Sequence, residues 1–590
     1  MLIINYWLRH FFSYFKIGNF SLLLFLLIFV NKNYSQKNVV LIITDDQGYG
    51  DFGFTGNPLV HTPHLDELAR QSIFATQYYV SPVCAPTRAS LMTGRYSLRT
   101  GVRDTYNGGA IMDSAEVTIA ELLRAEGYAT GIFGKWHLGD TYPSRPIDQG
   151  FDEALVHLSG GMGQVGDVTT FFEGDSSYFN PVLWHNGVPE QYQGYCSDIF
   201  AEGAIAFIRQ QGDQPFFCYL SFNAPHTPLQ LPASYYEKYK DIDPSLLANE
   251  SIEMTERDKE DARRVYGMVE NIDDNLGKLM DELKRSGRWD NTVVLFMTDN
   301  GPQQLRYNSG LRGLKGTVYE GGIRVPLLMR LPNGKKGRKM ESPIAHLDIL
   351  PTIADLLGIS LPDQLHLDGR SIVPLLEGVK DKWLDRPFLS YWTRRFPEKY
   401  QNISLHQGHF KLVGHTDYDA EVSDFELYDL SKDRGERNNI VGEHSGIAID
   451  MKAQMDKLLP DLLESMRTEA DPFIAIGSAH ENPVWLNRND ASGERGIWAQ
   501  DEIYGFWEVK AEKGCYELEI KMRSIPAESG SVLVEMGEQV FRKKVDFEGV
   551  DTVVLPPICL EAFEGPLLVQ FWSGGRQVMP FWVRINYIED

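Results

Sequence analysis

The sequence predicts an α/β protein with a large, mostly parallel sheet flanked by helices, followed by a smaller C-terminal subdomain and an all-β, sandwich-like domain. Three observations support this fold class. Apolar runs of strand length recur through the first half of the chain, and each ends in polar residues. Helical periods lie between these runs. Beyond residue 480, short strand signals alternate with turn residues and the helical periods stop.

Four apolar runs predict strands that are buried on both faces, as in parallel sheets. They are Asn38 to Thr44, Tyr128 to Phe133, Phe216 to Phe222 and Asn291 to Thr298. Polar, ionisable residues follow each run. Because the ligands of parallel sheets bind beyond the carboxyl ends of the strands, we expect the functional site where these four ends converge.

Helical periods separate the predicted strands, which favours an α/β fold with a largely parallel sheet. The helical segments are Thr118 to Glu126, Asp198 to Gln210 and Asp258 to Ser286. A further helix is predicted from Met451 to Thr468, ahead of the change to the all-β region.

The chain changes character near Asp471 and Pro472, and six short strand signals follow. These signals predict a β-sandwich of about 100 residues. We expect the main α/β domain at residues 36–375, its C-terminal subdomain at 376–475 and the accessory β domain at 480–590. The strand signals are Gly505 to Val509, Gly514 to Met522, Ser531 to Glu535, Thr552 to Leu555, Leu567 to Trp572 and Pro580 to Ile588.

Composition excludes several classes of protein. Of the 590 residues, 43% are hydrophobic and 23% are charged, which excludes a collagen, a coiled-coil rod, a mostly disordered chain and a multispan membrane protein. The 81 acidic residues outnumber the 57 basic ones and give a net charge of −24. An acidic surface argues against nucleic-acid binding, and it means that any anion site must be a local positive pocket.

Residues 1–35 have the pattern of a secretory signal peptide. Arg9 and Lys16 precede an apolar run from Phe20 to Val30, and Ser35 is a small residue ahead of a polar one. The run is short for a membrane span, so we expect cleavage near Ser35 and no stable span afterwards; an uncleaved anchor is the alternative. Loss of three positive charges, Lys32 included, would take the net charge from −24 to −27. The style of the signal predicts a bacterial protein that is periplasmic or secreted.

Cys84 lies in the most informative segment, Ser81 to Arg95. Its thiol is close in sequence to the cation of Arg88 and to an expected helix start, and both features lower a thiol pKa and favour a nucleophile. An isolated cysteine is more often a small buried residue. The five cysteines are too few and too scattered for a disulfide scaffold, and the pairing of the other four stays open (Cys196, Cys218, Cys515 and Cys559).

Two acidic pairs follow predicted strands. Asp45 and Asp46 come directly after the first strand, and Asp299 and Asn300 follow another strand much later in the chain. Three carboxylates and one amide oxygen are hard ligands that suit Ca²⁺ or Mg²⁺ rather than zinc or copper. One such pair is a weak signal, whereas two pairs at the ends of apolar strands favour a divalent cation site.

Three further segments supply cations and histidines. Lys135 and His137 are two residues apart in an extended segment and so point the same way, although a solvated lysine beside a packed histidine is the commoner case. His226 lies in Asn-Ala-Pro-His-Thr-Pro, and Lys315 lies in Leu-Arg-Gly-Leu-Lys-Gly. Less specific candidates are Arg312 and Arg324, on charge grounds, and His157, His185 and His346, as structural or pocket-lining residues.

Cys84-x-Pro86-x-Arg88, followed by Thr93-Gly94, resembles the signature of the formylglycine-dependent, arylsulfatase-like sulfatase family. With the other segments, the resemblance covers about residues 37–470 and leaves the β-rich end outside. It implies an alkaline-phosphatase-type fold and the hydrolysis of sulfuric esters. It also implies that a maturation enzyme converts Cys84 to formylglycine (3-oxoalanine).

The same resemblance implies a metal site. One divalent cation, most often calcium and sometimes magnesium, would be held by five residues. They are Asp45, Asp46, Cys84, Asp299 and Asn300.

The resemblance further implies that the hydrated aldehyde at residue 84 is the nucleophile. Arg88 would stabilise its attacking oxygen together with the cation, while Lys135 and Lys315 bind the sulfate oxygens. His226, with Lys315 nearby, would protonate the departing alcohol. His137 would take the proton of the second hydroxyl, so that sulfate is released.

The family acts on sulfated sugars, aryl sulfates and sterol sulfates. A secreted chain with a β-sandwich tail fits polysaccharide degradation best, and we expect galactose- or N-acetylgalactosamine-type sulfates, with specificity in loops such as Gly160 to Ser177. The alternatives are a phosphodiesterase or phosphonate monoester hydrolase of the same superfamily, an inactive glycan-binding protein and a surface adhesin. Tryptophans of the tail are expected in the core and at the domain interface rather than on sugar rings (Trp485, Trp498, Trp507, Trp572 and Trp582).

Overall fold

The computed structural model describes residues 37–588 apart from 171–176, 248–252, 333, 335–336, 380–382, 384–385, 395, 469–471, 525 and 527–528. The predicted signal peptide, residues 1–35, lies outside the described residues, as do Asp471 and part of the loop from Gly160 to Ser177. Within the described residues, no helix has both the length and the apolar character that are needed to cross a membrane.

The centre of the largest sheet is parallel, as predicted. β1 (Asn38–Thr44) pairs with β7 (Phe216–Ser221) on one side and with β8 (Thr292–Thr298) on the other. β3 (Ala129–Lys135) follows next to β7, and β4 (Glu153–His157) follows next to β3. The carboxyl ends of these five strands therefore lie along one edge of the sheet.

The flanks of this sheet are mixed. Antiparallel β9 (Arg324–Arg330) joins β8 to β2 (Ile73–Tyr79). β2 also pairs in parallel with β10 (Arg338–Met340) and β11 (Ile344–Ala345). On the other flank, β5 (Val182–His185) and β6 (Val188–Gln191) add two antiparallel strands beyond β4.

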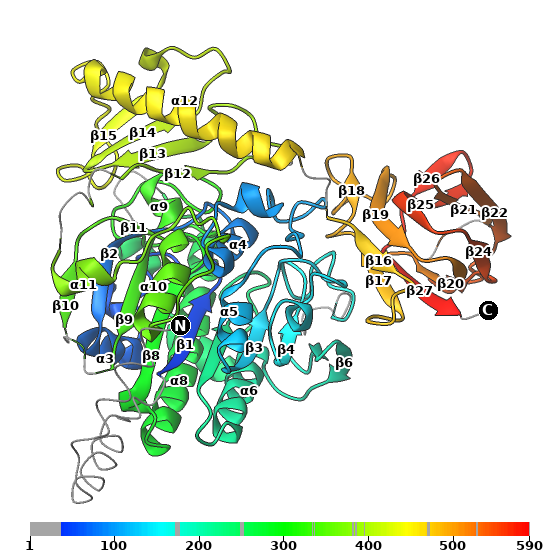
Figure 1. Ribbon diagram of the computed structural model, residues 1–590, viewed down its shortest axis with the longest axis horizontal. Coiled ribbons are helices and arrows are strands. Elements are labelled where there is room, and N and C mark those ends of the chain that lie inside the picture. Colours follow the sequence, from blue (N-terminus) through cyan, green and yellow to red (C-terminus); the bar gives the residue numbers. More distant parts are fainter. Residues whose placement is uncertain are drawn as a thin grey trace, which may run out of the picture. The chain divides into compact units, whose positions relative to one another are not determined.

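Helices cover both faces of the sheet (Figure 1). Alternate residues of β1 point to opposite faces. Leu41 and its neighbours on one face pack against α4 (Cys84–Thr93), α5 (Ile119–Ala125) and α10 (Ile349–Leu357). On the other face, Val40 and Ile42 pack against α3 (Pro63–Gln71), α6 (Cys196–Gln210) and α8 (Glu256–Arg285). Three shorter helices are α7 (Ala233–Tyr239), α9 (Glu320–Ile323) and α11 (Val373–Glu377).

Local sequence explains where two predicted helices begin. Thr118 precedes α5, and its hydroxyl accepts a hydrogen bond from the backbone N–H of Glu121 at 3.1 Å. The Glu121 carboxylate accepts the backbone N–H of Thr118 in return. Thr255 and Asp258 make the same reciprocal pair at the start of α8. Such capping boxes satisfy backbone donors that a helix start leaves without partners.

A second, smaller sheet corresponds to the predicted C-terminal subdomain. Four antiparallel strands run in chain order: β12 (Phe388–Tyr391), β13 (Ile403–Gln407), β14 (Phe410–Gly414) and β15 (Glu426–Asp429). The helix α12 (Ser445–Thr468) packs along this sheet (Figure 1). Its apolar core includes Leu405 and Leu427 from the strands and Met455 from the helix.

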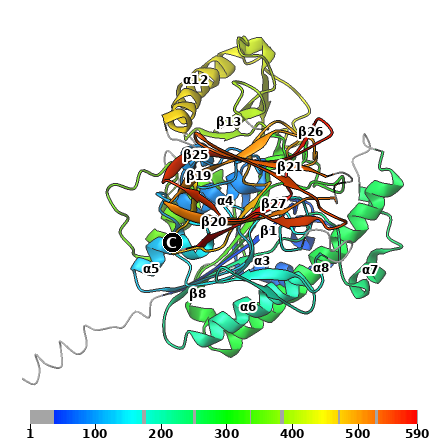
Figure 2. The same ribbon diagram turned by 90° about the vertical axis from the view of Figure 1, so that its right-hand side faces the viewer.

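The C-terminal part forms two further sheets around one apolar core (Figures 1 and 2). The first sheet contains β16 (Ile474–Ile476), β18 (Ser492–Gly493), β19 (Gly505–Ala511), β21 (Gly530–Met536), β22 (Gln539–Val545), β25 (Phe563–Ser573) and β26 (Arg576–Val578). The second contains β17 (Val484–Asn487), β20 (Gly514–Lys521), β23 (Thr552–Val554), β24 (Ile558–Leu560) and β27 (Trp582–Ile588). The predicted fold class, α/β with an additional sandwich-like β domain, is confirmed.

The pairing of the cysteines, which the sequence leaves open, is visible in the structure. Cys515 on β20 and Cys559 on β24 form a disulfide. Cys84, Cys196 and Cys218 are free and buried. The predicted domain boundaries stay a prediction, and β16 already pairs with β19 ahead of the expected start of the β domain at residue 480.

Candidate active site

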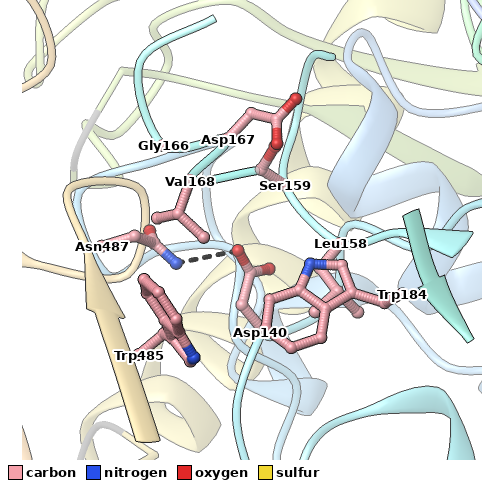
Figure 3. A pocket seen from close by; sticks show the side chains of 9 residues that line it. All are labelled: Asp140, Leu158, Ser159, Gly166, Asp167, Val168, Trp184, Trp485 and Asn487. Atoms are coloured by element: carbon pink, nitrogen blue, oxygen red, sulfur yellow. Dashed lines mark hydrogen bonds between the residues drawn. The ribbon is translucent and has the colours of Figure 1, made fainter. Parts of the chain in front are cut away.

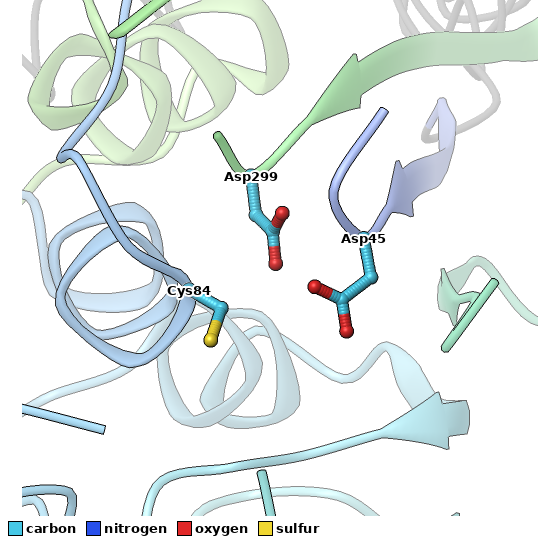
Figure 4. Close-up of side chains that lie close together, drawn as sticks. All are labelled: Asp45, Cys84 and Asp299. Carbon is cyan, nitrogen blue, oxygen red and sulfur yellow. The ribbon is translucent and has the colours of Figure 1, made fainter. Parts of the chain in front are cut away.

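All ten predicted site residues lie near the carboxyl ends of the parallel strands, on α4 or in the loop that precedes α9. The acidic pairs follow β1 and β8, one lysine–histidine segment begins at the end of β3, and the loop after β7 carries the second histidine. In Figure 4 the carboxylates of Asp45 and Asp299 converge with the thiol of Cys84, and their ligand atoms lie within 4.8 Å of one another. The ten residues are Asp45, Asp46, Cys84, Arg88, Lys135, His137, His226, Asp299, Asn300 and Lys315.

Three oxygen atoms of the acidic cluster are buried without a hydrogen-bond partner among the described residues. They are Oδ1 of Asp45, Oδ2 of Asp46 and Oδ1 of Asn300, and all three residues are 0% exposed. A buried polar atom without a partner destabilises the folded protein by about 1–3 kcal/mol. A positively charged ligand bound to these three oxygens would remove this cost. Carboxylate and amide oxygens are the donors that Ca²⁺ and Mg²⁺ prefer. The residues present therefore fit a divalent cation.

Each carboxylate of the cluster faces a cationic side chain. Nζ of Lys135 lies 2.6 Å from Oδ2 of Asp45, and Nζ of Lys315 lies 2.6 Å from Oδ1 of Asp46. Nη2 of Arg88 donates to Oδ2 of Asp299 at 2.8 Å. Three positive and three negative groups balance, so a bound divalent cation would give the site a positive charge. Such a site suits an anionic head group.

The charges change the ionisation of the cluster. Burial raises the pKa of Asp45, but Lys135 and the other nearby cations outweigh burial and hold this pKa well below its ordinary value. Burial, together with the charge of Asp45, raises the pKa of Asp299 to about 7. Burial lowers the pKa of Lys315, but the carboxylate of Asp46 outweighs it and raises the pKa overall. Lys315 therefore stays protonated at neutral pH.

The prediction of a lowered thiol pKa at Cys84 is wrong for the unmodified cysteine. Cys84 is the first residue of α4, so the expected helix start is confirmed. The side chain is almost fully buried, and burial raises the thiol pKa in spite of the nearby charges of Lys135 and Lys315. An unmodified Cys84 would be protonated and a weak nucleophile at neutral pH.

His137 is held in one orientation. Its Nε2 lies 2.8 Å from the carbonyl oxygen of Thr105, and because a carbonyl only accepts, Nε2 must carry the proton. Nδ1 is then a proton acceptor, and it is buried without a partner among the described residues. Burial and the charge of Lys135 lower the pKa of His137, which favours the neutral ring. Gly160 is needed beside it, because a Cβ there would lie 2.7 Å from Nε2.

His226 is oriented differently. Its Nδ1 donates to the carbonyl oxygen of Thr227 at 2.7 Å. Its Nε2 lies 3.6 Å from Oδ2 of Asp46. Burial lowers the pKa of His226, while the charge of Asp46 opposes this effect. The ring thus presents Nε2 to the acidic cluster, next to Lys315.

A pocket of about 580 Å³ opens over this cluster. Cys84, His137, His226 and Lys315 all line it. The two alternatives to Lys315 point elsewhere: Arg312 donates to the Tyr428 hydroxyl, and Arg324 pairs with Glu320. Of the other histidine candidates, none lines the pocket: His346 faces the Ser81 hydroxyl, His185 faces Glu153, and His157 is buried at the end of β4.

The sequence did not reveal residues that hold the site from behind. Arg306 and Asp51 form an ion pair whose side chains are 0% exposed. Nη2 of Arg306 also donates to the carbonyl oxygen of Asp46 at 2.7 Å. Asp46 has a φ of 61°, in the left-handed region that few non-glycine residues adopt. The buried arginine thus stabilises a strained backbone next to the acidic cluster.

Ser221 was also missed. Nη1 of Arg88 donates to its hydroxyl oxygen at 2.6 Å, and that hydroxyl donates to the carbonyl oxygen of Lys135 at 2.6 Å. This chain of hydrogen bonds fixes the guanidinium against the end of β3. Neither Ser221 nor the Asp51–Arg306 pair belongs to a recognisable motif, and the only available signal was their position close to the strand ends.

Comparison with known proteins agrees with this geometry. The profile of the family described as Sulfatase matches residues 37–359, and the profile described as "N-sulphoglucosamine sulphohydrolase, C-terminal" matches residues 314–464. Both matches end ahead of the β domain.

Individual relatives cover most of their own length. Human arylsulfatase A is 30% identical over 75% of this chain and 89% of its own. An ulvan-active sulfatase of Formosa agariphila is 30% identical over 74% of this chain and 83% of its own. The crystal structure of Ps i-CgsB in complex with k-i-k-neocarrahexaose matches with a TM-score of 0.62 and 29% identity, over 72% of this chain and 92% of that one. The chain therefore belongs to the sulfatase family and is a sulfuric ester hydrolase.

Proposed function

We propose that this sulfatase removes sulfate from a carbohydrate, with residue 84 as formylglycine and with one calcium ion at the acidic cluster. The observation that carries the metal part is the set of three buried oxygens without partners, on Asp45, Asp46 and Asn300. Formylglycine is supported by the match of Cys84, Pro86 and Arg88 to the signature of the family to which the chain belongs.

Asp45, Asp46, Asp299 and Asn300, together with residue 84, would hold the cation; magnesium is the alternative to calcium. When bound, the cation supplies positive charge that polarises sulfate oxygens and lowers the pKa of a coordinated hydroxyl. The hydrated aldehyde of formylglycine, made by a maturation enzyme, would supply the attacking hydroxyl.

The cations of the site would bind and orient the sulfate group. Lys135 and Lys315 each lie 2.6 Å from a carboxylate of the cluster; Lys315 lines the pocket, and Lys135 is buried beneath it. Arg88 is fixed by Asp299 and Ser221, so its charge is preorganised. Preorganised charges stabilise the charge that develops in a transition state without further reorganisation.

The two histidines would move protons in different steps. His226 presents Nε2 beside Asp46 and Lys315; in its protonated form, with a proton on both ring nitrogens, it would give the Nε2 proton to the departing alcohol oxygen and return to the neutral ring. His137 presents Nδ1, the acceptor atom that its bond to Thr105 leaves available, and would remove the proton from the hydroxyl of residue 84 when sulfate is released. General acid and base steps of this kind are each worth about 10²–10⁴-fold.

A carbohydrate substrate is supported by two relatives. One is named as active on ulvan, and another was crystallised with a neocarrahexaose. A galactose- or N-acetylgalactosamine-type sulfate is the class we propose. The disulfide between Cys515 and Cys559 suits an oxidising compartment, which supports a periplasmic or secreted bacterial enzyme.

The test compares sulfate esters with phosphorus esters, and an aryl sulfate with carbohydrate sulfates, on one enzyme preparation. We would measure kcat/KM for 4-nitrophenyl sulfate, 4-nitrophenyl phosphate and a phenylphosphonate monoester, and for sulfated oligosaccharides from ulvan and carrageenan. The proposal expects turnover of sulfate esters above the phosphorus esters, and turnover of at least one oligosaccharide. Faster hydrolysis of the phosphorus esters would favour a phosphodiesterase or phosphonate hydrolase. Glycan binding without any turnover would favour an inactive glycan-binding protein.

A further inference from the structure

Three parts of the chain meet at the outer wall of the active-site pocket. The main α/β part contributes Tyr106 and Gln164, and the segment after β12 contributes Trp392 and Arg394. The β domain contributes Asn489 and Trp498, from the connection between β17 and β19. The pocket is therefore incomplete without the β domain, although neither family profile extends into it.

Trp498 lies at the domain interface, as the sequence predicts for tryptophans of the tail, and it differs from the others in also lining the pocket. Trp507 is fully buried, and Trp485 and Trp582 pack against each other with ring centroids 4.8 Å apart. Trp498 instead lines the pocket. Its Nε1 is buried and has no hydrogen-bond partner among the described residues. The indole as a whole is partly exposed, so a ligand in the pocket would contact its ring rather than this enclosed atom.

The position of Trp498 is fixed by its own turn. The neighbouring Ile497 is 0% exposed and belongs to the apolar core of the β domain. The backbone N–H of Ile497 donates to the carbonyl oxygen of Glu494 at 3.2 Å, and that of Ala499 donates to Gly496 at 2.9 Å. The ring of Trp498 lies 6.0 Å from the ring of Tyr106, at an angle of 41°. The turn and the contact with Tyr106 thus fix the position of the indole at the edge of the pocket.

Polar contacts hold the β domain against the main α/β part. Nδ2 of Asn487, at the end of β17, donates to Oδ2 of Asp140 at 2.8 Å (Figure 3). The backbone N–H of Asp140 donates to Oδ2 of Asp490 at 3.2 Å. The backbone N–H of Gly108 donates to the carbonyl oxygen of Asn489 at 3.3 Å. These groups are buried, so the wall that carries Trp498 is a built part of the site.

The chemistry of the outer wall differs from that of the floor of the pocket, where the acidic cluster and its cations lie. Arg394 is neutralised by Asp104, whose Oδ1 accepts its Nη1 at 3.0 Å. The Arg394 guanidinium also lies over the rings of Tyr106 and Trp392, with centroid distances of 4.9 Å and 4.7 Å. Other polar residues of the lining carry neutral groups, among them the amides of Gln164, Gln303 and Asn489. Aromatic rings with neutral amides suit the apolar face and the hydroxyls of a sugar, whereas the charged floor suits the sulfate.

We propose that Trp498 is a sugar-binding platform, and that the β domain thereby forms the subsite for the part of the glycan next to the sulfated residue. This proposal rests on the proposed carbohydrate sulfatase function. A volume of about 580 Å³ is far larger than one sulfate group and lies in the range of pockets that hold whole organic ligands.

The test uses two sulfate esters, of which only the larger one is expected to reach the wall of the pocket that carries Trp498. We would measure kcat and KM for 4-nitrophenyl sulfate and for the ulvan or carrageenan oligosaccharide that the wild-type enzyme hydrolyses fastest. Trp498→Ala should lower kcat/KM for the oligosaccharide about tenfold or more, mainly through KM, because one central aromatic contact is worth that much. The rate on 4-nitrophenyl sulfate should change less than about twofold, since this substrate does not reach the wall.

Two further variants keep the outcome interpretable. Trp572→Ala removes a partly buried tryptophan of the same β domain that does not line the pocket, and it should leave both substrates unaffected. Trp498→Phe keeps an aromatic face of smaller area, and it should give an intermediate loss. An equal loss on both substrates, or no loss on the oligosaccharide, would overturn the platform. If the wild type hydrolyses only 4-nitrophenyl sulfate, the carbohydrate function itself fails and the platform fails with it.

Discussion

Replacing Arg306 by methionine should destabilise the protein strongly, because the substitution leaves a carboxylate buried without its cation. Arg306 and Asp51 are both 0% exposed, and the guanidinium donates to Oδ2 of Asp51 at 2.7 Å and to Oδ1 at 2.8 Å. Among the described residues, the hydrogen bond that Asp51 would keep is that from the backbone N–H of Gly48, at 2.7 Å. Methionine fills a similar volume but supplies no donor.

The expected loss in free energy of unfolding follows from the burial of this ion pair. Removing one partner of a buried ion pair costs about 3–5 kcal/mol. With a denaturant slope of about 3 kcal/mol/M in urea, the unfolding midpoint should fall by about 1 M or more. Activity should fall as well, since Arg306 also donates to the carbonyl oxygen of Asp46 in the acidic cluster.

The assay is urea unfolding followed by fluorescence, with 4-nitrophenyl sulfate turnover measured in parallel. Arg576→Met is the matched control, because it breaks an ion pair of 3.0 Å with Glu502 in which both side chains are more than half exposed. Exposed pairs contribute about 1 kcal/mol or less, so its midpoint should move little. The double variant Asp51→Asn with Arg306→Met should recover part of the loss. Equal midpoints for Arg306→Met and Arg576→Met would refute the reasoning.

Three further predictions concern the ion, the pH and the disulfide. Exhaustive chelation should abolish turnover and lower the melting temperature, and calcium at about 100 times its Kd should restore about 2.7 kcal/mol of stability; unchanged activity after chelation would contradict the metal site. Burial raises the pKa of Asp490 to about 6, so the folded state binds a proton that the unfolded chain releases, and stability should fall as the pH rises from about 4 to about 6. Asp490→Asn should flatten that part of the melting-temperature profile, and an unchanged profile would contradict the assignment. Replacing Cys515 and Cys559 by alanine opens a link across 44 residues and should cost about 4 kcal/mol in urea unfolding; a loss near zero would contradict it.

The sequence was most informative where chemistry and topology coincide. The runs at β1 and β8 end in acidic pairs, and parallel strands end on one edge, which predicted a shared site. The direct pairing of β1 with β8 then brings Asp45 and Asp299 close together. Lys315 was chosen over Arg312 and Arg324 from a motif, and it is the cation that faces Asp46.

Features that depend on distant contacts could not be predicted. Arg306 and Asp51 are 255 positions apart and carry no motif, yet they pair in the interior. The pKa of Cys84 is raised mainly by burial, and burial cannot be predicted from an arginine nearby in the sequence. Trp498 resembles any other tryptophan of the β domain until the fold brings it next to Tyr106. The edge strand β22 was missed because Arg542, Lys543 and Lys544 hide its pattern, a common protection of exposed edges.

The most direct test of the proposed catalytic chemistry is the mass of the tryptic peptide that contains residue 84, from protein produced in its native host and shown to hydrolyse 4-nitrophenyl sulfate. Formylglycine makes this peptide about 18 Da lighter than the cysteine form, because sulfur and two hydrogens are replaced by one oxygen. We predict the lighter peptide in active protein. An unmodified cysteine at residue 84 in protein that is fully active would contradict the proposed nucleophile.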